Sequence, residues 1–473
     1  MEVAENEVQR VVVAGASGFV GMDLIRKLSS TCQVIALTRS EHAGDSIPNQ
    51  RSPGVCWVRC NLFSLKQTEA ALTGADAAYF LVHSMMPSAR LTQGQYKDLD
   101  LFIADNFSRA CDTNNVRRII YLGGILPASG YVSEHLQSRF EVELALSARR
   151  SELVALRAGL VLGPGGSSSQ ILLKLVKRLP LMVCPPWTAK LSSPISLKDT
   201  VDALRMSLSG AKVKPGAYDL GGPELVSYRS LMERSADEMC LRRVFIGIPV
   251  FSTRLSSLWV SVISGQSKEL VAPLIQSLLV DMRPGVSAPL FPQKPEKISL
   301  IAALHQAELP RLPLEISGSQ AQDRNPIQIM SSVISIQRLP RPPGWNAHDL
   351  LEKYLTWLPA ILRPVIKIQN SDGFHIGLHL RGIKSSLLSL RLVPERSDNN
   401  RALLFITGGI LNKAQPNKQG RLEIRVLDKQ NIALSAVIDF TPALPWPIYL
   451  CTQAIAHRII MKLFAVHLKK IAK

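Results

Sequence analysis

Cysteine patterns that bind metal are lacking from this sequence. The chain has 473 residues and seven cysteines, an odd number at irregular spacing, and no two of them form a C-x-x-C pair. Their absence excludes the common zinc-binding and thioredoxin-like motifs, so we expect no metal site. Unpaired thiols at irregular spacing are typical of a reducing compartment.

Signal peptides and long apolar runs are also lacking. Residues 1–10 are acidic and polar, unlike a secretory signal. The most apolar window, residues 244–263, contains Arg254 and several Ser and Thr residues, and an arginine is costly in the core of a bilayer. We therefore expect a cytoplasmic protein.

Acidic residues are few relative to basic ones. There are 37 Asp and Glu residues against 55 Lys and Arg residues, a net charge of +18, and residues 323–473 hold 21 of the basic and 9 of the acidic residues. Such a basic segment fits an anionic lipid, a nucleic acid or simply a solvated surface. Because its basic residues are not interleaved with aromatic ones, we expect no nucleic-acid partner.

The length and the apolar content indicate two or three domains. Hydrophobic residues make up 46% of the chain, which is enough for sizeable cores. Short apolar runs alternate with helical stretches, and the predicted strands are residues 10–14, 33–38, 55–60, 77–82, 118–122, 153–157 and 216–220. Strands separated by helix-length segments predict an α/β fold, with a doubly wound parallel Rossmann sheet in residues 8–225.

The rest of the chain divides into three parts. The apolar spacing of residues 226–305 predicts a mostly helical region, which we expect to form the substrate side, and residues 306–326 are predicted to be a polar linker. In residues 327–473 apolar residues alternate with period two, which is typical of half-buried antiparallel strands. We expect a separate α+β antiparallel-sheet domain there: a strand, short helices near 346–354 and 355–362, about six strands, and a long helix over 448–471.

A glycine-rich loop follows the first predicted strand. Gly15, Gly18 and Gly21 have the spacing G-x-x-G-x-x-G, and a helix is expected from Met22. The first glycine permits a tight turn, the second a close approach of the backbone to a pyrophosphate, and the third close helix packing. The amides at the start of the helix favour an anion, so the loop predicts a dinucleotide site.

The residues at the end of the second predicted strand indicate which dinucleotide binds. An acidic residue there would bind the 2′-hydroxyl of the adenosine ribose, but Thr38, Arg39 and Ser40 occupy this position. A guanidinium can pair with a 2′-phosphate, which favours NADP(H) over NAD(H). The alternative is that Arg39 is an ordinary surface arginine.

With these motifs the N-terminal part resembles the short-chain dehydrogenase/reductase superfamily, in its atypical NmrA-like branch. The segments that carry the resemblance are residues 15–21, 79–85, 118–124, 156–165, 193–199 and 218–223. Residues 79–85 are similar to a bacterial subgroup of NAD(P)-binding proteins that have a C-terminal DUF2867-type region. The resemblance implies that these residues contact the cofactor: Gly15, Ser17, Gly18, Phe19, Val20, Gly21, Arg39, Asn61, Leu62, Val82, His83, Gly123 and Arg139.

The sequence departs from that family at its catalytic residues. The family uses Tyr-x-x-x-Lys on the helix after the fifth strand, with a Ser at the end of that strand. Here His135 and Arg139 stand at the Tyr and Lys positions, and Gly123 and Gly124 stand where the Ser would be. An imidazole can donate a proton near neutral pH, whereas a guanidinium stays charged, so His135 and Arg139 are the candidate catalytic residues.

Three functions fit these residues. The first is an NADP(H)-dependent reductase of a small, moderately apolar carbonyl or enone. The second is a non-catalytic redox sensor or assembly factor that binds NAD(P)H. The third is a lipid-binding module with a structural nucleotide.

The order of elements in residues 327–473 is similar to the helix-grip fold of START-like and polyketide-cyclase-like proteins. In that fold a curved antiparallel sheet wraps a long C-terminal helix. The predicted helix is apolar on one side and carries basic residues, among them Arg458, Lys462 and Lys469. It is either a core helix with a basic tip or a peripheral contact with an anionic membrane, at its inner face.

Overall fold

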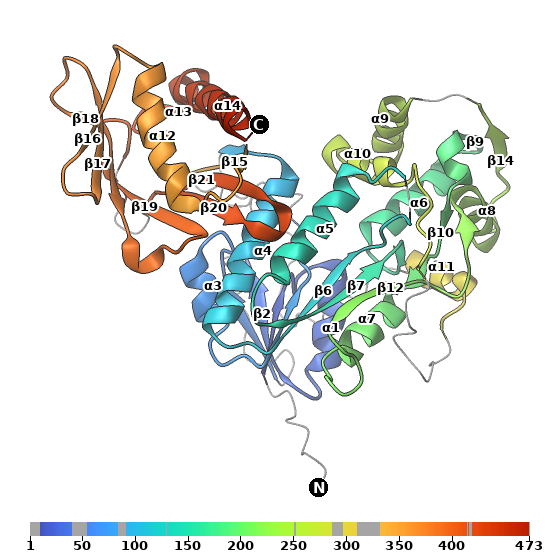
Figure 1. Ribbon diagram of the computed structural model, residues 1–473. Coiled ribbons are helices and arrows are strands. Elements are labelled where there is room, and N and C mark those ends of the chain that lie inside the picture. The colour runs from blue at the N-terminus through green and yellow to red at the C-terminus, as the bar shows by residue number, and fades with distance from the viewer. Residues whose placement is uncertain are drawn as a thin grey trace, which may run out of the picture. The chain divides into compact units, whose positions relative to one another are not determined.

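A computed structural model of the chain describes residues 10–39, 54–83, 91–128, 130–249, 252–285, 297–309, 332–413, 415 and 419–472 (Figure 1). The chain forms two compact units. Unit 1 consists of Met1–Met85 and Ile103–Gln322, and unit 2 consists of Met86–Phe102 and Asp323–Lys473. The boundary therefore falls twice within the range that the sequence assigns to the Rossmann domain.

Unit 1 contains a parallel sheet of seven strands. Its order is β12-β7-β6-β4-β1-β2-β3. The strands are β1 (Arg10–Ala14), β2 (Gln33–Thr38), β3 (Val55–Arg59), β4 (Ala77–Phe80), β6 (Arg118–Gly124), β7 (Glu152–Ala158) and β12 (Gly216–Leu220). These are the seven strands predicted from the sequence, and the doubly wound parallel sheet is confirmed. β4 ends at Phe80, before Val82, and residues 84 and 85 lie outside the described residues.

Helices cover both faces of this sheet, so its strands are apolar on both sides (Figure 1). On one face, α1 (Phe19–Leu28) and α7 (Leu197–Met206) share a core with Val11 and Val13. On the other, Phe107 of α4 (Tyr96–Thr113) packs against Phe80, with ring centroids 5.1 Å apart. α3 (Leu65–Ala71) and α5 (Glu134–Leu146) complete the Rossmann part.

The rest of unit 1 is mostly helical, and residues 226–305 contain helices as their apolar spacing predicts. It contains α6 (Ser167–Arg178), α8 (Tyr228–Glu238), α9 (Thr253–Ser264), α10 (Lys268–Ser277) and α11 (Leu300–Glu308). Short strands join them: β8 (Val161–Leu162) with β11 (Ile195–Ser196), β9 (Leu181–Cys184) with β14 (Val244–Gly247), and β10 (Leu191–Ser192) with β13 (Val226–Ser227). Most of the predicted linker lies outside the described residues. Among the described helices, none is long and apolar enough to cross a membrane.

Unit 2 contains a second, mostly antiparallel sheet. Its order is β16-β17-β18-β19-β20-β21-β15-β5, and the C-terminal segment of unit 2 contains the helices α12 (Ala347–Ile361), α13 (Trp446–Cys451) and α14 (Gln453–Ile471). The strands are β5 (Leu91–Gln93), β15 (Val333–Pro340), β16 (Ile366–Asn370), β17 (His375–Leu380), β18 (Ser386–Leu392), β19 (Arg401–Gly408), β20 (Arg421–Leu427) and β21 (Ile432–Phe440). The predicted α+β class of this part is confirmed.

Two details of the predicted helices are wrong. The short helices expected near 346–354 and 355–362 form one continuous helix, α12, which begins with a capping box at Asn346 and Asp349. The single helix expected over 448–471 is divided at Thr452, whose backbone is not helical (φ −124°, ψ −83°). The Thr452 hydroxyl donates to the carbonyl of Ile448, which satisfies a group that the interrupted helix leaves free.

The segment Met86–Phe102 joins unit 2, although the predicted range 8–225 places it in the Rossmann domain. Its strand β5 pairs in parallel with β15. The side-chain amide of Gln93 donates a hydrogen bond to the backbone carbonyl of Ala454 at 3.1 Å. Farther along, the guanidinium of Arg338 donates to the Asp98 carboxylate at 2.7 Å, across 240 residues of sequence. No signal in the alternating pattern distinguishes this segment from its neighbours.

A buried cluster of charges lies on one face of the second sheet. The Glu423 carboxylate accepts hydrogen bonds from Arg401 and Arg421 at 2.9 Å and from Arg425 at 2.6 Å. The Arg425 guanidinium is fully buried and lies over the Phe102 ring, 3.9 Å from its centroid. Period two predicts a half-buried strand here, but β20 is buried on both faces, and its charged residues form ion pairs with one another, with Arg401 and with Asp439.

Candidate functional site

The glycine loop connects β1 to α1 at the point where the strand order reverses. Gly15 has φ +88°, and its carbonyl accepts a hydrogen bond from the amide of Gly18 at 3.0 Å. α1 then begins at Phe19, three residues earlier than predicted, and the positive end of the helix dipole lies at the loop. In a doubly wound sheet, ligands bind at this switch point beyond the carboxyl ends of the strands.

The loop is packed so closely that only glycine fits at two positions. A Cβ atom on Gly15 would lie 2.8 Å from backbone atoms of Leu81 in the segment after β4. A Cβ atom on Gly21 would lie 2.2 Å from the carbonyl oxygen of Gly15. The turn predicted at Gly15 and the close helix packing predicted at Gly21 therefore have a steric basis.

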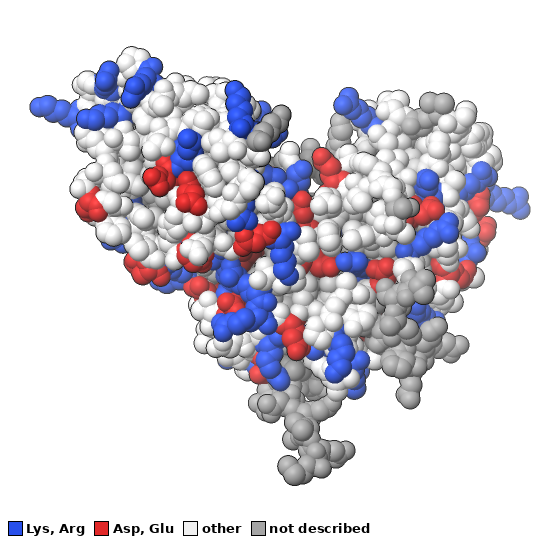
Figure 2. Space-filling view, in the orientation of Figure 1, with Lys and Arg blue, Asp and Glu red and all other residues white. Residues whose placement is uncertain are grey.

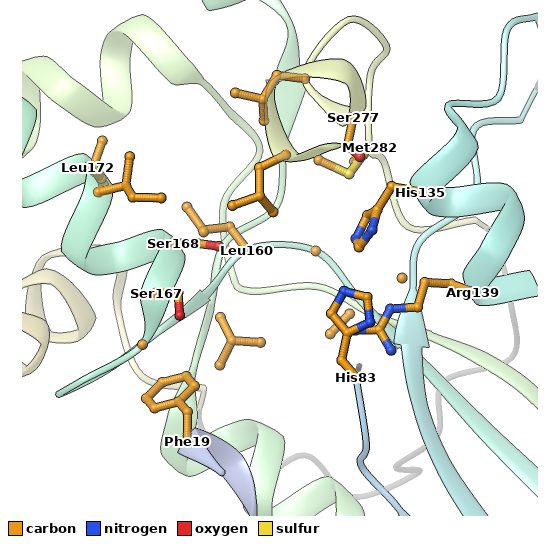
Figure 3. Close-up of a pocket in the computed structure, with 18 of the residues that line it drawn as sticks. Phe19, His83, His135, Arg139, Leu160, Ser167, Ser168, Leu172, Ser277 and Met282 are labelled. Carbon is orange, nitrogen blue, oxygen red and sulfur yellow. The ribbon is translucent and has the colours of Figure 1, made fainter. Parts of the chain in front are cut away.

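A cavity of about 420 Å³ opens from this loop toward the helical region (Figure 3). Nine of the predicted site residues line it: Gly15, Gly18, Phe19, Val20, Gly21, His83, Gly123, His135 and Arg139. The volume is in the range typical of small-molecule sites. Among the described residues, five predicted site residues do not line it: Ser17, Arg39, Asn61, Leu62 and Val82.

Two histidines and an arginine meet at one side of the cavity. His135 and Arg139 lie one turn apart on α5, and His83 follows β4; Figure 3 shows all three side chains directed toward the same space. The rings of His83 and His135 have centroids 5.2 Å apart. The structure thus brings together three of the four ionisable residues that the sequence singled out, while Arg39 lies outside the cavity lining.

Contacts outside the cavity hold α5 in place. The hydroxyl of Tyr121 in β6 donates to the carbonyl of Arg139 at 3.0 Å. Ser133 caps α5, and its hydroxyl also lies 3.1 Å from the hydroxyl of Ser277 on α10. The helix that carries His135 is therefore anchored both to the parallel sheet and to the helical region.

The end of β6 has glycines, Gly123 and Gly124, where the family has its serine, and neighbouring side chains fill the space that a serine side chain would need. A Cβ atom on Gly123 would lie 2.8 Å from the Tyr121 ring, and one on Gly124 would lie 2.9 Å from the Leu136 side chain. The family's serine could not be restored here without moving these neighbours. Any proton transfer must therefore use other groups, and His135 and His83 are the histidines that line the cavity among the described residues.

The far end of the cavity is apolar and was not predicted residue by residue. Helices α6, α8, α9 and α10 supply most of it, including Leu172, Leu231, Val260 and Leu274. Among the described residues that line the cavity, none is acidic. Burial raises the pKa of the Tyr228 hydroxyl, and the nearby Ser192 opposes this shift in part, so Tyr228 is neutral at physiological pH.

The sequence reading also missed Ser167 and Ser168, which line the cavity at the start of α6. The loop before them contains Gly163 and Gly166, and both pack against the Phe19 ring. A glycine-rich run that opens a helix is the signal that could have identified them, because such helix starts favour anions.

Arg39, Asn61 and Leu62, three further predicted cofactor residues, follow the carboxyl ends of β2 and β3. Arg39 is exposed directly after β2. Asn61 accepts a hydrogen bond from the amide of Phe63 at 3.1 Å, and the carbonyl of Leu62 accepts one from Asn106 at 2.7 Å. The side-chain oxygen of Asn61 thus shapes the turn after β3.

Comparisons with known proteins support the assignment of the glycine loop to a dinucleotide site. Residues 15–152 match the family model described as NAD(P)H-binding. The auxiliary protein GraX of Staphylococcus aureus is 30% identical over 130 residues, which are 27% of this chain and 39% of GraX. The matched part thus spans about two fifths of that curated relative.

Solved structures with a similar fold cover a larger part of the chain. A nucleoside-diphosphate-sugar epimerase of S. aureus is 13% identical, covers 63% of this chain and 99% of its own, and has a TM-score of 0.48. The triphenylmethane reductase of Citrobacter sp., complexed with NADP(H), is 15% identical with the same coverage and TM-score. WbmG of Bordetella bronchiseptica, in complex with NAD, is 13% identical over 59% of this chain and 98% of its own, with a TM-score of 0.43.

The strand order, the glycine loop and the family match define the N-terminal part as an NAD(P)H-binding domain of the Rossmann type. The glycine loop, the start of α1 and the cavity that they line fit a nicotinamide dinucleotide. The family match ends at residue 152, so the resemblance to a DUF2867-type C-terminal region stays a prediction.

Proposed function

We propose that the protein is an NADP(H)-dependent reductase of a moderately apolar carbonyl or enone. The observation that carries this proposal is one continuous cavity, lined by the glycine loop, by His135 and Arg139, and by the apolar side chains of α6, α8, α9 and α10. A site that combines a dinucleotide loop, a proton donor and an apolar chamber suits hydride transfer to an uncharged substrate.

The bound nicotinamide would supply a hydride to the substrate. His135 donates the proton that the carbonyl or enolate oxygen then requires, since an imidazole exchanges protons near neutral pH. Arg139 stays charged and holds the ribose or the carboxamide of the nicotinamide. The apolar residues orient the substrate and exclude water from the reacting atoms.

The first test removes the proton donor. We expect His135→Phe to lower turnover about a hundredfold, because general acid catalysis is lost while the cavity keeps a ring of similar size. NADPH oxidation would be followed with a panel of apolar aldehydes, ketones and enones. The affinity for NADPH, measured by fluorescence, should change little.

His305→Phe is the matched control, because His305 lies on α11 and is paired with Glu238 at 3.0 Å, outside the cavity lining. It should leave turnover unchanged. Full activity of His135→Phe on an identified substrate would show that His135 is not the acid.

The preference for NADP(H) depends on Arg39. We expect Arg39→Ala to weaken NADPH binding about tenfold and to leave NADH binding unchanged, because only the former has a 2′-phosphate for the guanidinium. Both cofactors would be titrated by fluorescence, with Arg26→Ala as a control, since Arg26 pairs with Asp23 on α1. Equal affinities for both cofactors, unaffected by Arg39→Ala, would contradict the preference.

A non-catalytic NAD(P)H sensor or assembly factor is the second candidate. Two observations favour it: the filled space beside Gly123 and Gly124, and the similarity to GraX, which is named an auxiliary protein. If the wild-type protein binds NADPH but reduces no member of the carbonyl panel, this second function is the one supported.

A further inference from the structure

Helix α14 presents apolar side chains on two opposite faces. Met461, Phe464 and Leu468 form the buried face and belong to the core of unit 2. Phe464 packs between the rings of Tyr354 and Trp357 of α12, each with its centroid 5.1 Å away. This face accounts for the helix as a core element, but not for the rest of its apolar residues.

The opposite face of α14 is a stripe of exposed aliphatic residues. Ile455, Ile459, Leu463 and Val466 are spaced by four, four and three residues, so they lie along one line of the helix. They are 39%, 51%, 45% and 53% exposed. We call these four residues the outer stripe. On α13, Ile448 and Leu450 are 52% and 43% exposed and extend the apolar surface.

Basic side chains accompany the outer stripe. Arg458, Lys462, Lys469 and Lys470 are all exposed, and Arg458 and Lys462 directly precede Ile459 and Leu463 in the sequence. No residue of Gln453–Ile471 is acidic. Figure 2 shows Lys and Arg side chains gathered near the C-terminal end of α14.

We propose that the outer stripe and its basic residues bind the surface of an anionic lipid bilayer. The helix would lie parallel to the surface, with the aliphatic side chains inserted at the level of the headgroups. The lysine stems can extend along the apolar layer while their ammonium groups reach lipid phosphates and carboxylates. Since no described helix can span a bilayer, this contact is peripheral.

The charges on α14 argue against the other occupants of such a face. Self-association through the outer stripe would bring two sets of four cationic side chains together without acidic partners, which is unfavourable. Nucleic acid would use the charges, but the exposed face has no aromatic ring on which a base could stack. An anionic bilayer uses both the aliphatic and the cationic residues.

The test is co-sedimentation of the full-length protein with vesicles of phosphatidylcholine alone or mixed with phosphatidylserine. We expect binding to the mixed vesicles, at least tenfold weaker to neutral ones, and weakened by salt. Two double variants, Ile459→Gln with Leu463→Gln and Lys462→Glu with Lys469→Glu, should each reduce binding to the mixed vesicles at least tenfold.

Matched controls use exposed residues elsewhere. Leu255→Gln with Leu258→Gln on α9 removes two aliphatic side chains that are 54% and 51% exposed. Lys367→Glu with Lys384→Glu reverses two exposed charges of unit 2 outside α14. Both controls should bind like wild type, and melting curves would verify that all variants are folded.

Other outcomes would overturn the proposal. These are failure of the wild-type protein to bind anionic vesicles, or binding that both α14 variants retain. A dimer in solution that Ile459→Gln with Leu463→Gln abolishes, without vesicle binding by the wild type, would assign the outer stripe to a second copy of the chain. None of these measurements requires NADPH, so they test the membrane proposal independently of the reductase proposal.

Discussion

A single methyl group at Gly21 is expected to abolish dinucleotide binding. In Gly21→Ala the new carbon would lie 2.2 Å from the carbonyl oxygen of Gly15 and 2.9 Å from backbone atoms of Ala16. These are backbone atoms of the loop itself, so the clash is relieved only if α1 moves away from β1. The amides of α1 and the loop would then no longer share one anion site. Fluorescence titration should show no saturable NADPH binding.

Gly247→Ala is a suitable control, because a Cβ atom there lies 3.8 Å from the nearest heavy atom, the end of the Arg229 side chain. It should bind NADPH like wild type. Circular dichroism and a melting curve would establish that Gly21→Ala is still folded. A folded Gly21→Ala variant with unchanged NADPH affinity would mean that the cofactor does not depend on this loop.

Replacing Glu423 by glutamine should destabilise unit 2 more than any surface change. The substitution keeps the shape of the side chain but leaves Arg401, Arg421 and Arg425 with less opposing charge in a site closed to water. Breaking a buried ion pair by removing one partner costs about 3–5 kcal/mol. Hydrogen exchange of peptides from β19 to β21 would measure the loss, with Glu352→Gln, on the exposed face of α12, as the control.

The pH dependence of this effect has a definite sign. Burial by itself would raise the pKa of Glu423, but Arg425, Arg401 and Arg421 outweigh it and hold the pKa well below its ordinary value. A carboxyl with a lowered folded pKa stabilises the fold above its unfolded pKa, and this stabilisation is lost as the pH falls through the folded value. The difference between wild type and Glu423→Gln should therefore be full at neutral pH and shrink in acid. A difference of constant size at every pH would contradict the assignment of charge to Glu423.

The parallel sheet could be predicted because its signals are local. All seven strands are short apolar runs separated by helices, and such a pattern has few other solutions. The glycine loop could be placed for the same reason, since it directly follows the first strand, whereas His135 and Arg139 follow from the resemblance to the short-chain dehydrogenase/reductase superfamily. The cavity that joins them confirms that they are neighbours, while their chemical roles stay predictions.

The features that the sequence did not predict depend on partners far along the chain. The sequence predicts residues 226–305 as the substrate side, but the side chains that line the apolar chamber come from α6, α8, α9 and α10, none of which alone indicates a pocket. β20 alternates Leu422, Ile424 and Val426 with charged residues, a pattern that predicts one wet face. That face is buried because Arg401 of the neighbouring strand β19 and Phe102 of the segment Met86–Phe102 pack against it. Both residues are distant in the sequence, so the pattern within β20 does not predict them.

The two-part composition of unit 2 has a consequence for biosynthesis. Asp98 and β5 leave the ribosome well before their partners, because Arg338 follows Asp98 by 240 residues. At about 5–20 residues per second, this interval lasts roughly 10–50 s. During that time β5 lacks its partner strand and the Asp98 carboxylate, which is buried in the folded protein, is exposed to water. The strands of the parallel sheet of unit 1 are therefore synthesised before most strands of the sheet of unit 2. A chaperone that binds at this stage would protect residues 91–102.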